Sequence, residues 1–477
     1  MVSFLLNRGT APRRAAADPN LTMLEYLRAQ GLTGVKEGCA SGDCGACAVA
    51  AAADDGCGGL RYDVVHSCIC PAAALHARHI ITVEGLEDEG GRLHPAQQAM
   101  VDCHGSQCGF CTPGFVISLF VHAKNNGGTT HEELTERLSG NLCRCTGYRP
   151  ILDAGRALAR NRKKDWFERR RARTARLLRE LGRRPPGNPP QYYAPRTVRG
   201  LAALLAANPR IRILAGGTDI MLEATQQLRQ FESLAFIGGI AAMSTIRETR
   251  REWNIGGGAT FADMMNTVAA HPQMEDLRAA LSRFGSPQIR ARATVGGNIA
   301  NASPVADGPP ALLALDAVLA LRRGDSVRRL PLAQFYRGYK KTALRPGEFI
   351  ERIIVPKPHP QEIFRMYKVS KRADDDIAAV CAAFKFAGGD EVSPAPRIAF
   401  GGMAAVPARA RKCELAWKKS GRHGAIEPVL RALSEDFQPI SDARAGAVYR
   451  AAVAANLLRK ARCGMRPEFF AAETSAR

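Results

Sequence analysis

The sequence lacks long apolar runs. No stretch of its 477 residues approaches the 18 or so uninterrupted apolar residues of a membrane-spanning helix. The N-terminal segment from Met1 to Arg14 also lacks the apolar stretch and the cleavage site of a secretory signal. We therefore expect a folded protein of the cytoplasm that does not bind a membrane.

Acidic residues are scarce relative to basic ones. The chain has 45 Asp and Glu against 67 Lys and Arg, a net charge of +22. Such a balance is compatible with a nucleic acid, an acidic partner or an anionic cofactor as the bound species. Part of the excess is local, because eleven basic and three acidic residues lie between Asn161 and Arg184. No nucleic-acid-binding fold accompanies this stretch, so we expect no nucleic acid as partner.

Cysteine is not scarce, and its context excludes a disulfide scaffold. Fourteen cysteines occur in a chain without a secretory signal, and the cytosol keeps thiols reduced. Metal ligation or redox chemistry is the better explanation for so many thiols. The chain also contains no G-x-G-x-x-G at a strand-to-helix turn, which excludes the Rossmann fingerprint.

A first cysteine group lies between Gly38 and Cys47. Cys39, Cys44 and Cys47 form a C-x4-C-x2-C run, and Cys68 follows about twenty residues later. This spacing matches the plant-type [2Fe–2S] loop, in which main-chain N–H groups point at an anionic cluster. Glycine permits the positive φ and close approach that the loop needs, which accounts for Gly38, Gly42 and Gly45. A zinc knuckle or unrelated buried thiols are the alternatives, and Cys70 competes with Cys68 as fourth ligand.

A second group combines C-x2-C with C-x-C. It consists of Cys108, Cys111, Cys143 and Cys145, and four thiolates again suit one cluster. We predict a helix that includes the apolar run 115–121, with Thr112 as its N-cap and Pro113 as its first helical residue. We predict further helices over 131–139 and from Pro150 to about 160. Cys143 and Cys145 then lie in the turn before Pro150. We expect ordinary structural thiols at the six other cysteines: Cys57, Cys70, Cys103, Cys381, Cys413 and Cys463.

Strand-like apolar runs with glycine pairs follow the basic stretch. The segment 161–195 is Arg-rich and then Pro-rich, which predicts a solvated interdomain connector or a docking strip. The glycine pairs lie at 211–219, 256–260 and 294–298. Such loops let main-chain N–H groups reach a pyrophosphate, although each alone is also compatible with a tight turn.

Two strings carry a resemblance to a known family. The strings 104–114 (HGSQCGFCTPG) and 140–150 (GNLCRCTGYRP) resemble the iron–sulfur portion of xanthine dehydrogenase and its molybdenum-hydroxylase relatives. The segments 214–220 (LAGGTDI) and 293–307 (ATVGGNIANASPVAD) resemble the FAD domain of the same family.

The resemblance implies an α+β multidomain fold. It predicts a ferredoxin-like β-grasp [2Fe–2S] domain at 1–88 and a helical-bundle [2Fe–2S] domain at 89–160. A basic, Pro-rich linker at 161–192 follows. An α+β FAD-binding domain of the non-Rossmann, vanillyl-alcohol-oxidase-like type is predicted at 193–358, and a small C-terminal α+β flavoprotein domain at 359–477, where 397–403 resembles the start of a strand.

The resemblance also assigns residues, none of them as general acid or base. Alignment back from 82–85 favours Cys68 over Cys70. Gln107 would contact the molybdopterin, and Tyr339, Asp375 and Ile377 the NAD. The predicted FAD contacts are Leu214, Ala215, Gly216, Gly217, Thr218, Asp219, Ile220, Phe284, Thr294, Asn298, Ser303, Asp307, Ile350 and Lys368.

The function that the resemblance implies is electron transfer. It suggests the iron–sulfur/FAD subunit of an NAD-dependent xanthine dehydrogenase of purine catabolism, with no room for the molybdopterin domain. A large molybdopterin-binding partner and a dimer of heterodimers are expected. The alternatives are a subunit of an aldehyde or N-heterocycle oxidoreductase and, more remotely, a nucleic-acid-binding iron–sulfur protein.

Overall fold

The computed structural model describes residues 1–88, 90–160, 164–184, 191–388 and 396–467, and it divides into two compact units. Each unit joins segments that are distant in sequence. The predicted FAD-binding stretch contributes to both units. Unit 1 comprises Met1–Arg196, Ile211–Gly239 and Ser286–Arg292, and unit 2 comprises Thr197–Arg210, Ile240–Gly285 and Ala293–Arg477.

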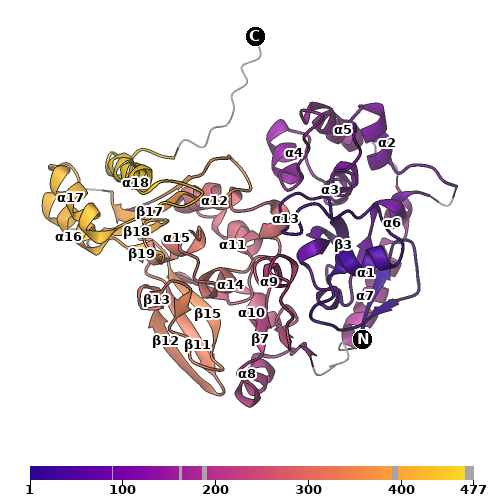
Figure 1. The fold of residues 1–477 in the computed structure, drawn as a ribbon, viewed down its shortest axis with the longest axis horizontal. Coiled ribbons are helices and arrows are strands. Elements are labelled where there is room, and N and C mark those ends of the chain that lie inside the picture. Colours follow the sequence, from indigo (N-terminus) through magenta and orange to yellow (C-terminus); the bar gives the residue numbers. More distant parts are fainter. Residues whose placement is uncertain (89, 161–163, 185–190, 389–395, 468–477) are drawn as a thin grey trace, which may run out of the picture. The chain divides into compact units, whose positions relative to one another are not determined.

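A five-stranded sheet opens unit 1, in the order β2-β1-β5-β3-β4. Only β1 and β5 pair in parallel, and the other neighbours are antiparallel. With one helix crossing the sheet, this is the predicted β-grasp arrangement (Figure 1). The elements are β1 (Val2–Leu6), β2 (Arg13–Ala15), α1 (Met23–Ala29), β3 (Ala48–Asp54), β4 (Leu60–His66), η1 (Ser67–Ile69), η2 (Ala72–Leu75), β5 (His79–Ile81) and η3 (Val83–Leu86).

Both faces of the sheet are covered, which explains the alanine run of β3. Val49 and Ala51 face a core that includes Leu24 and Leu27 of α1. Ala48, Ala50 and Ala52 face a second core that includes helices α3 (Thr112–Lys124) and α7 (Arg171–Arg183). Successive strand residues point to opposite faces, so small side chains let helices approach from both sides.

The helical [2Fe–2S] domain is built around one central helix, α3. Residues 114–122 of α3 are all buried, as expected for a helix that is apolar all round. Its N-cap is Cys111 rather than Thr112, one residue earlier than predicted. The helices over 131–138 and 149–159 agree with prediction, and Tyr148 caps the latter at a φ of 67°. The helices are α2 (Pro95–Asp102), α3 (Thr112–Lys124), α4 (His131–Leu138) and α5 (Arg149–Ala159).

The predicted linker is folded over its described residues, contrary to the expectation of a solvated connector. It contains α6 (Trp166–Arg169) and α7 (Arg171–Arg183), and α7 buries Ala175 and Leu178 against the sheet. Asp165 caps α6 and accepts hydrogen bonds from His94 Nε2 at 2.8 Å and Lys124 Nζ at 2.5 Å. The outer face of α7 keeps the basic residues.

The remaining segments of unit 1 form a small parallel sheet, β6-β8-β7, with two short helices. This sheet packs into the same apolar core as α1, through Tyr192, Leu214 and Leu234. The elements are β6 (Tyr192–Tyr193), β7 (Arg212–Leu214), α9 (Met221–Thr225), β8 (Leu234–Phe236) and α13 (Pro287–Arg290).

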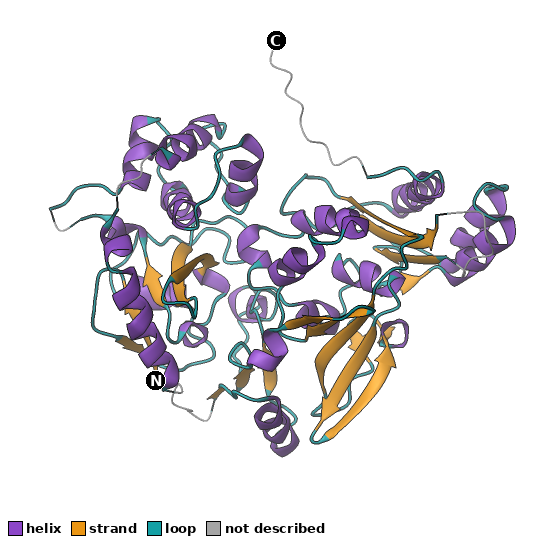
Figure 2. Ribbon diagram, turned by 180° about the vertical axis from the view of Figure 1, so that it is seen from behind, coloured by secondary structure: helices purple, strands orange, loops and turns teal. Residues whose placement is uncertain are grey.

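Unit 2 begins with a five-stranded antiparallel sheet, β12-β11-β15-β10-β9. Its strands appear as long orange arrows in Figure 2. The elements are α8 (Val198–Ala207), α10 (Ala241–Ser244), β9 (Ile246–Glu248), β10 (Glu252–Gly256), α11 (Phe261–Val268), η4 (Pro272–Met274), α12 (Glu275–Ser282), α14 (Val295–Ala300), α15 (Gly308–Ala314), β11 (Val318–Arg323), β12 (Ser326–Pro331), η5 (Leu332–Gln334), β13 (Tyr336–Gly338), β14 (Lys341–Thr342) and β15 (Phe349–Pro356).

A four-stranded antiparallel meander and three helices complete unit 2, as predicted for the C-terminal α+β domain. The predicted strand at 397–403 is β18. Among the described residues, no helix is long and apolar enough to cross a membrane. The elements are β16 (Glu362–Val369), β17 (Val380–Ala387), β18 (Arg397–Gly401), β19 (Ala408–Arg409), α16 (Arg411–Ser420), α17 (Glu427–Asp436) and α18 (Ala447–Arg462).

Candidate cofactor sites

The first cysteine group comes together in the loop before β3 and in η1. The Sγ atoms of Cys47 and Cys68 lie 3.3 Å apart. Cys39 contacts Cys44, whose main-chain N–H lies 3.3 Å from the Cys39 Sγ, and it also contacts Cys68. The four predicted thiols are therefore neighbours.

The loop points main-chain N–H groups at sulfur. Cys39 Sγ accepts from the N–H groups of Ser41 and Asp43 at 3.4 Å and 3.3 Å. Gly42 and Gly45 have φ values of 83° and 73°, as predicted. Gly38 has no positive φ, but a Cβ there would lie 2.8 Å from Cys44 Sγ. Such a nest of N–H groups suits a bound anion.

Cys70 lies apart from this group. Its side chain is fully buried, and its Sγ is 3.6 Å from the carbonyl oxygen of Pro71. Burial raises the pKa of the Cys70 thiol above its ordinary value, which favours the protonated thiol over the thiolate that binds metal. The structure thus places Cys68, and not Cys70, beside the other three thiols.

The second group forms at the start of α3 and in the turn before α5. Cys108 contacts Cys145, and Cys111 contacts Cys143. Burial alone raises the pKa of Cys143, but hydrogen bonds from the Thr146 side chain and from main-chain N–H groups outweigh it and lower the pKa to about 7. A thiolate at neutral pH is therefore accessible here.

Each group consists of two close pairs, and no three or more His, Cys, Asp or Glu of the described residues are arranged around a single metal ion. A [2Fe–2S] cluster takes four thiolates, two on each of its two irons. The pairs Cys39/Cys44 and Cys47/Cys68, and the pairs Cys108/Cys145 and Cys111/Cys143, fit that requirement.

A direct hydrogen bond joins the two loops. The N–H of Leu142, next to Cys143, donates to the carbonyl of Cys44 at 3.0 Å. Glycines permit this approach: a Cβ at Gly114 would lie 2.3 Å from the Gly45 oxygen. Asn141, 2% exposed, donates from Nδ2 to Ser118 Oγ at 2.8 Å and packs against both glycines. The two cysteine-containing loops are thus joined directly by one main-chain hydrogen bond.

The two groups differ in exposure. Cys47 and Cys68 are each 2% exposed, whereas Cys108 and Cys145 are exposed at the surface of unit 1. Apolar rings lie exposed near the second group, at Phe110 and Tyr148, and Gln107 is exposed as well. The second group is the one that a partner could approach.

Seven of the predicted FAD contacts, Leu214 to Ile220, run from the last residue of β7 through the loop that leads to α9 in unit 1. Within the described part of the chain, the N–H groups of Gly216, Gly217 and Thr218 donate to no protein acceptor. Gly217 has a φ of 85°, and a Cβ there would lie 3.1 Å from the Ile69 oxygen. Arg292 Nε donates to the Gly216 carbonyl at 3.1 Å. N–H groups available in a glycine turn fit a diphosphate.

Of the other two glycine pairs, the one at 256–260 forms the tight turn that the sequence left open, and the strand-like run at 294–298 is a helix instead. Gly256, Gly257 and Gly258 donate their N–H groups to main-chain carbonyls, so they serve close packing rather than phosphate binding. A Cβ at Gly257 would lie 2.1 Å from the Ile350 oxygen. Thr294 does not begin a strand: its Oγ1 accepts from the Gly297 N–H at 3.0 Å and caps α14. The capping side chain overrides the strand-like pattern.

Buried oxygens mark the FAD residues of unit 2. Asn298 Oδ1 and Asp307 Oδ1 are buried without a hydrogen-bond partner among the described residues. Asp307 Oδ2 pairs with Lys368 Nζ at 2.7 Å, and both side chains are almost fully buried. Buried oxygens without a partner are costly, so these two suit a ligand that donates hydrogen bonds.

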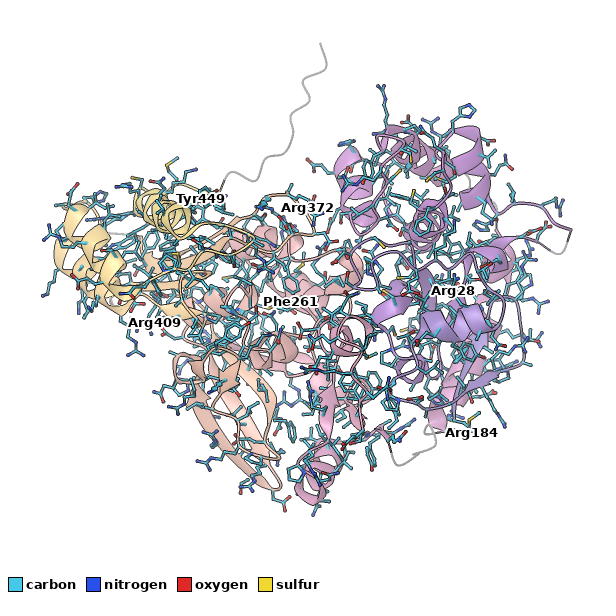
Figure 3. The ribbon with its side chains drawn as sticks, viewed as in Figure 1. Arg28, Arg184, Phe261, Arg372, Arg409 and Tyr449 are labelled. Atoms are coloured by element: carbon cyan, nitrogen blue, oxygen red, sulfur yellow. The ribbon has the colours of Figure 1, made fainter. Side chains whose placement is uncertain are left out.

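The remaining predicted FAD residues also lie in unit 2. The Phe284 ring is 4.3 Å from that of Phe261, which lies inside the unit (Figure 3). Ile350 is 6% exposed on β15, and Ser303 is half-buried in the turn before α15.

The predicted NAD residues lie on two exposed turns of unit 2. Tyr339 and Ile377 are 64% and 49% exposed, and Asp375 has a φ of 46°. Arg372, also exposed (Figure 3), donates to the Asp375 carbonyl at 3.0 Å. Lys340 Nζ donates to Asn301 Oδ1 at 2.6 Å and fixes the other turn.

Sequence reasoning missed several residues that hold these loops. Gln226 donates from Nε2 to Cys39 and Ala40 of the first cysteine loop. Arg283 donates to Lys368, Ser370 and Ala373. Arg292 holds Gly216. No motif contains these side chains, although Arg283 is next to Phe284 and Arg292 directly precedes the string 293–307 that carries the resemblance.

Four family models match the chain, in the order of the domains described. They are "2Fe-2S iron-sulfur cluster binding domain" at 8–72, "[2Fe-2S] binding domain" at 82–156, "FAD binding domain in molybdopterin dehydrogenase" at 188–358 and "CO dehydrogenase flavoprotein C-terminal domain" at 365–462. The predicted four-part architecture and the resemblance to the iron–sulfur/FAD portion of molybdenum hydroxylases are confirmed.

Known proteins add to this likeness. The chain is 31% identical to xanthine dehydrogenase of Emericella nidulans over 91% of its own length, and it spans 36% of that relative. Among solved structures, a chain of CO dehydrogenase from Oligotropha carboxidovorans matches at 25% identity and a TM-score of 0.52, covering 58% of this chain and 97% of that one. Quinoline 2-oxidoreductase from Pseudomonas putida 86, at 22% identity and a TM-score of 0.51, shares the fold over 57% of this chain and 97% of its own.

Proposed function

We propose that this chain is the electron-transfer component of an NAD-dependent xanthine dehydrogenase. It would carry electrons from the molybdenum cofactor of a large partner subunit through two [2Fe–2S] clusters to FAD and NAD. The first cluster would be held by Cys39, Cys44, Cys47 and Cys68, and the second by Cys108, Cys111, Cys143 and Cys145. The clusters supply one-electron chemistry and FAD couples it to hydride transfer, while the protein binds and positions them.

One observation carries the proposal: two four-thiol groups of unit 1 are joined by the Leu142–Cys44 hydrogen bond. The buried group lies beside Gly217, through Ile69, and the exposed group offers Gln107 and apolar rings to a partner. Electrons would enter at the exposed cysteine group, pass across the Leu142–Cys44 hydrogen bond and leave from the buried group towards the flavin. All of these residues belong to unit 1, which supports electron transfer between a partner and a flavin.

The FAD contacts support the flavin part of the proposal in two ways. The loop 214–220 offers N–H groups to a diphosphate, and unit 2 offers Asn298 and Asp307 as acceptors and Phe284 as an aromatic surface. Lys368 balances the charge of Asp307. The unit 2 side chains would bind and orient the flavin, and the buried Asp307 and Lys368 limit the access of water to it.

Xanthine as the substrate is supported by the xanthine dehydrogenase relatives, which match 91% of this chain within one polypeptide. The CO dehydrogenase chain matches only 58% of it. A second candidate function has an observation in its favour, because chains of a quinoline and a CO enzyme share the fold. The chain would then be the electron-transfer subunit of an N-heterocycle, aldehyde or CO oxidoreductase.

The two candidates are separated by substrate. The molybdopterin-binding partner is first identified by copurification and then co-expressed with the chain. The complex is assayed for anaerobic reduction of NAD by xanthine, by an N-heterocycle and by an aldehyde. We expect xanthine to be oxidised and the isolated chain to leave xanthine untouched. Oxidation of only the other substrates would establish the second candidate. A dimer of heterodimers is expected by native mass measurement, and a cytoplasmic location suits thiols that must stay reduced.

A further inference from the structure

The side-chain amide of Gln226 donates two hydrogen bonds to the first cysteine loop. Gln226 follows α9, in the segment Ile211–Gly239 that belongs to unit 1. Its Nε2 donates to the carbonyl of Cys39 at 3.0 Å and to that of Ala40 at 3.1 Å. One amide group therefore spans two successive peptide groups at the start of the ligand loop.

The turn at Cys39–Ala40 that accepts these hydrogen bonds is strained. Ala40 has a φ of 50°, in the left-handed region that non-glycine residues rarely adopt. The Ala40 carbonyl and the Ser41 N–H belong to the same peptide group, and that N–H donates to Cys39 Sγ at 3.4 Å. A hydrogen bond at the oxygen therefore fixes the plane of the peptide whose N–H faces the sulfur.

We infer that Gln226 is a positioning residue that sets the reduction potential of the first cluster. The inference rests on the proposed function, because it takes Cys39 as a cluster ligand. Gln226 acts through the Ala40–Ser41 peptide, and hydrogen bonds in series polarise one another. The segment that carries the candidate diphosphate loop thus also adjusts the cluster next to it.

The sign of the effect follows from charge. Reduction adds a negative charge to the cluster, and N–H groups directed at its sulfur atoms stabilise that charge. Loss of the Gln226 amide lets the strained Ala40–Ser41 peptide rotate away from Cys39. The reduced cluster is then less stable, so the potential falls.

The test uses Gln226→Leu, which keeps the size of the side chain and removes its donors. The matched control is the neighbouring Gln227→Leu, because Gln227 is equally exposed but its side chain makes no hydrogen bond within the described residues. Both are measured in the full, loaded chain by redox titration followed by electron paramagnetic resonance. The signal lost in Cys68→Ser identifies the first cluster.

We expect the equilibrium constant for reduction of the first cluster to fall about threefold to tenfold in Gln226→Leu, where tenfold is about 59 mV for a one-electron couple. The second cluster and Gln227→Leu stay at the wild-type value. Loss of the first cluster alone would overturn the inference, since Gln226 would then hold the loop and not set the potential. An unchanged potential with full iron content overturns it, as does a loss of both clusters.

Two further readouts separate this inference from the proposed function. Wild-type protein without iron at the first site would refute the cluster assignment itself, whatever Gln226 does. Removal of FAD should leave the difference between Gln226→Leu and wild type intact, because both hydrogen bonds lie within the protein. A difference that disappears with FAD would mean that the flavin transmits it, which contradicts the direct role of Gln226.

Discussion

Unit 1 and unit 2 hold their candidate site residues by different means. In unit 1, main-chain N–H groups of Ser41 and Asp43 face the Cys39 sulfur, and glycine turns let the loops approach. In unit 2, Asn298 and Asp307 each keep one buried side-chain oxygen without a partner among the described residues, and Lys368 pairs with Asp307. The first site is built from local loops, and the second from side chains on separate elements.

The difference teaches where each site is vulnerable. A loop site depends on the ligands themselves and on the space between loops, so small steric changes matter. A side-chain site with a buried ion pair depends on charge balance, so removal of one charge matters most. The predictions below test this contrast.

The largest effect is expected from Cys68→Ser compared with Cys70→Ser. Cys68 contacts Cys47 at 3.3 Å, while Cys70 is bonded to Pro71 in the core. Cys68→Ser should lower the iron content from about four to about two per chain, because one two-iron cluster is lost. Cys70→Ser should retain about four. Iron analysis and visible spectra provide the measurement, and the reverse pattern would show that Cys70 is the ligand.

Lys368→Met tests the charge balance of unit 2. The Asp307 carboxylate would lose its buried partner, which destabilises by about 3–5 kcal/mol, and FAD content should fall. Burial already raises the pKa of Asp307, opposed by Lys368, and loss of Lys368 raises it further. The folded variant then binds a proton that the unfolded chain releases near pH 3.9.

The stability lost in Lys368→Met should therefore grow as pH rises above that value towards the raised pKa of Asp307. Thermal unfolding at pH 5 and pH 8 measures this, with Lys418→Met on the exposed face of α16 as control. An equal loss of stability at both pH values would mean that Asp307 is not ionised in the native protein.

Gly114→Ala sharpens the contrast in unit 1. Its Cβ would lie 2.3 Å from the Gly45 oxygen, so the two loops must move apart. Overpacking of this kind costs about 1–3 kcal/mol, and the Leu142–Cys44 hydrogen bond should lengthen. We expect weaker magnetic coupling between the clusters by electron paramagnetic resonance. Gly182→Ala on α7, where the nearest atom is 3.7 Å away, should leave the coupling unchanged.

The smallest effect is expected from Asp375→Ala. A carboxylate on this turn can accept hydrogen bonds from a carboxamide or ribose. Its removal should therefore raise the KM for NAD, by an amount that corresponds to about 1–2 kcal/mol of lost binding free energy. FAD content and cluster signals should not change. Asp374→Ala, on the same exposed turn, is the control in steady-state kinetics. Equal kinetics in wild type and Asp375→Ala would remove Asp375 from the NAD site.

The predictability of the two units differs in the same way. The cysteine and glycine spacings predicted the first loop, including the positive φ of Gly42 and Gly45, because a local wrap determines both spacing and conformation. The roles of Gln226 and Arg292 could not be predicted, since each reaches a loop that is distant in sequence. The strand expected at 294–298 was wrong because the Thr294 hydroxyl caps a helix there, and an apolar pattern does not reveal such a cap.

The predicted connector failed for a related reason. Although the segment is basic overall, one face of α7 is apolar, and its residues Ala175 and Leu178 pack on the sheet. Composition averages over a helix, while packing uses only one face.

The most direct test of the central claim is an anaerobic titration of the purified chain with NADH, followed by electron paramagnetic resonance after iron and flavin analysis. The account predicts about four iron and one FAD per chain, and two distinct [2Fe–2S] signals that both appear on reduction by NADH. Iron near two per chain, zinc in place of iron, or clusters that stay oxidised while FAD is present would contradict it.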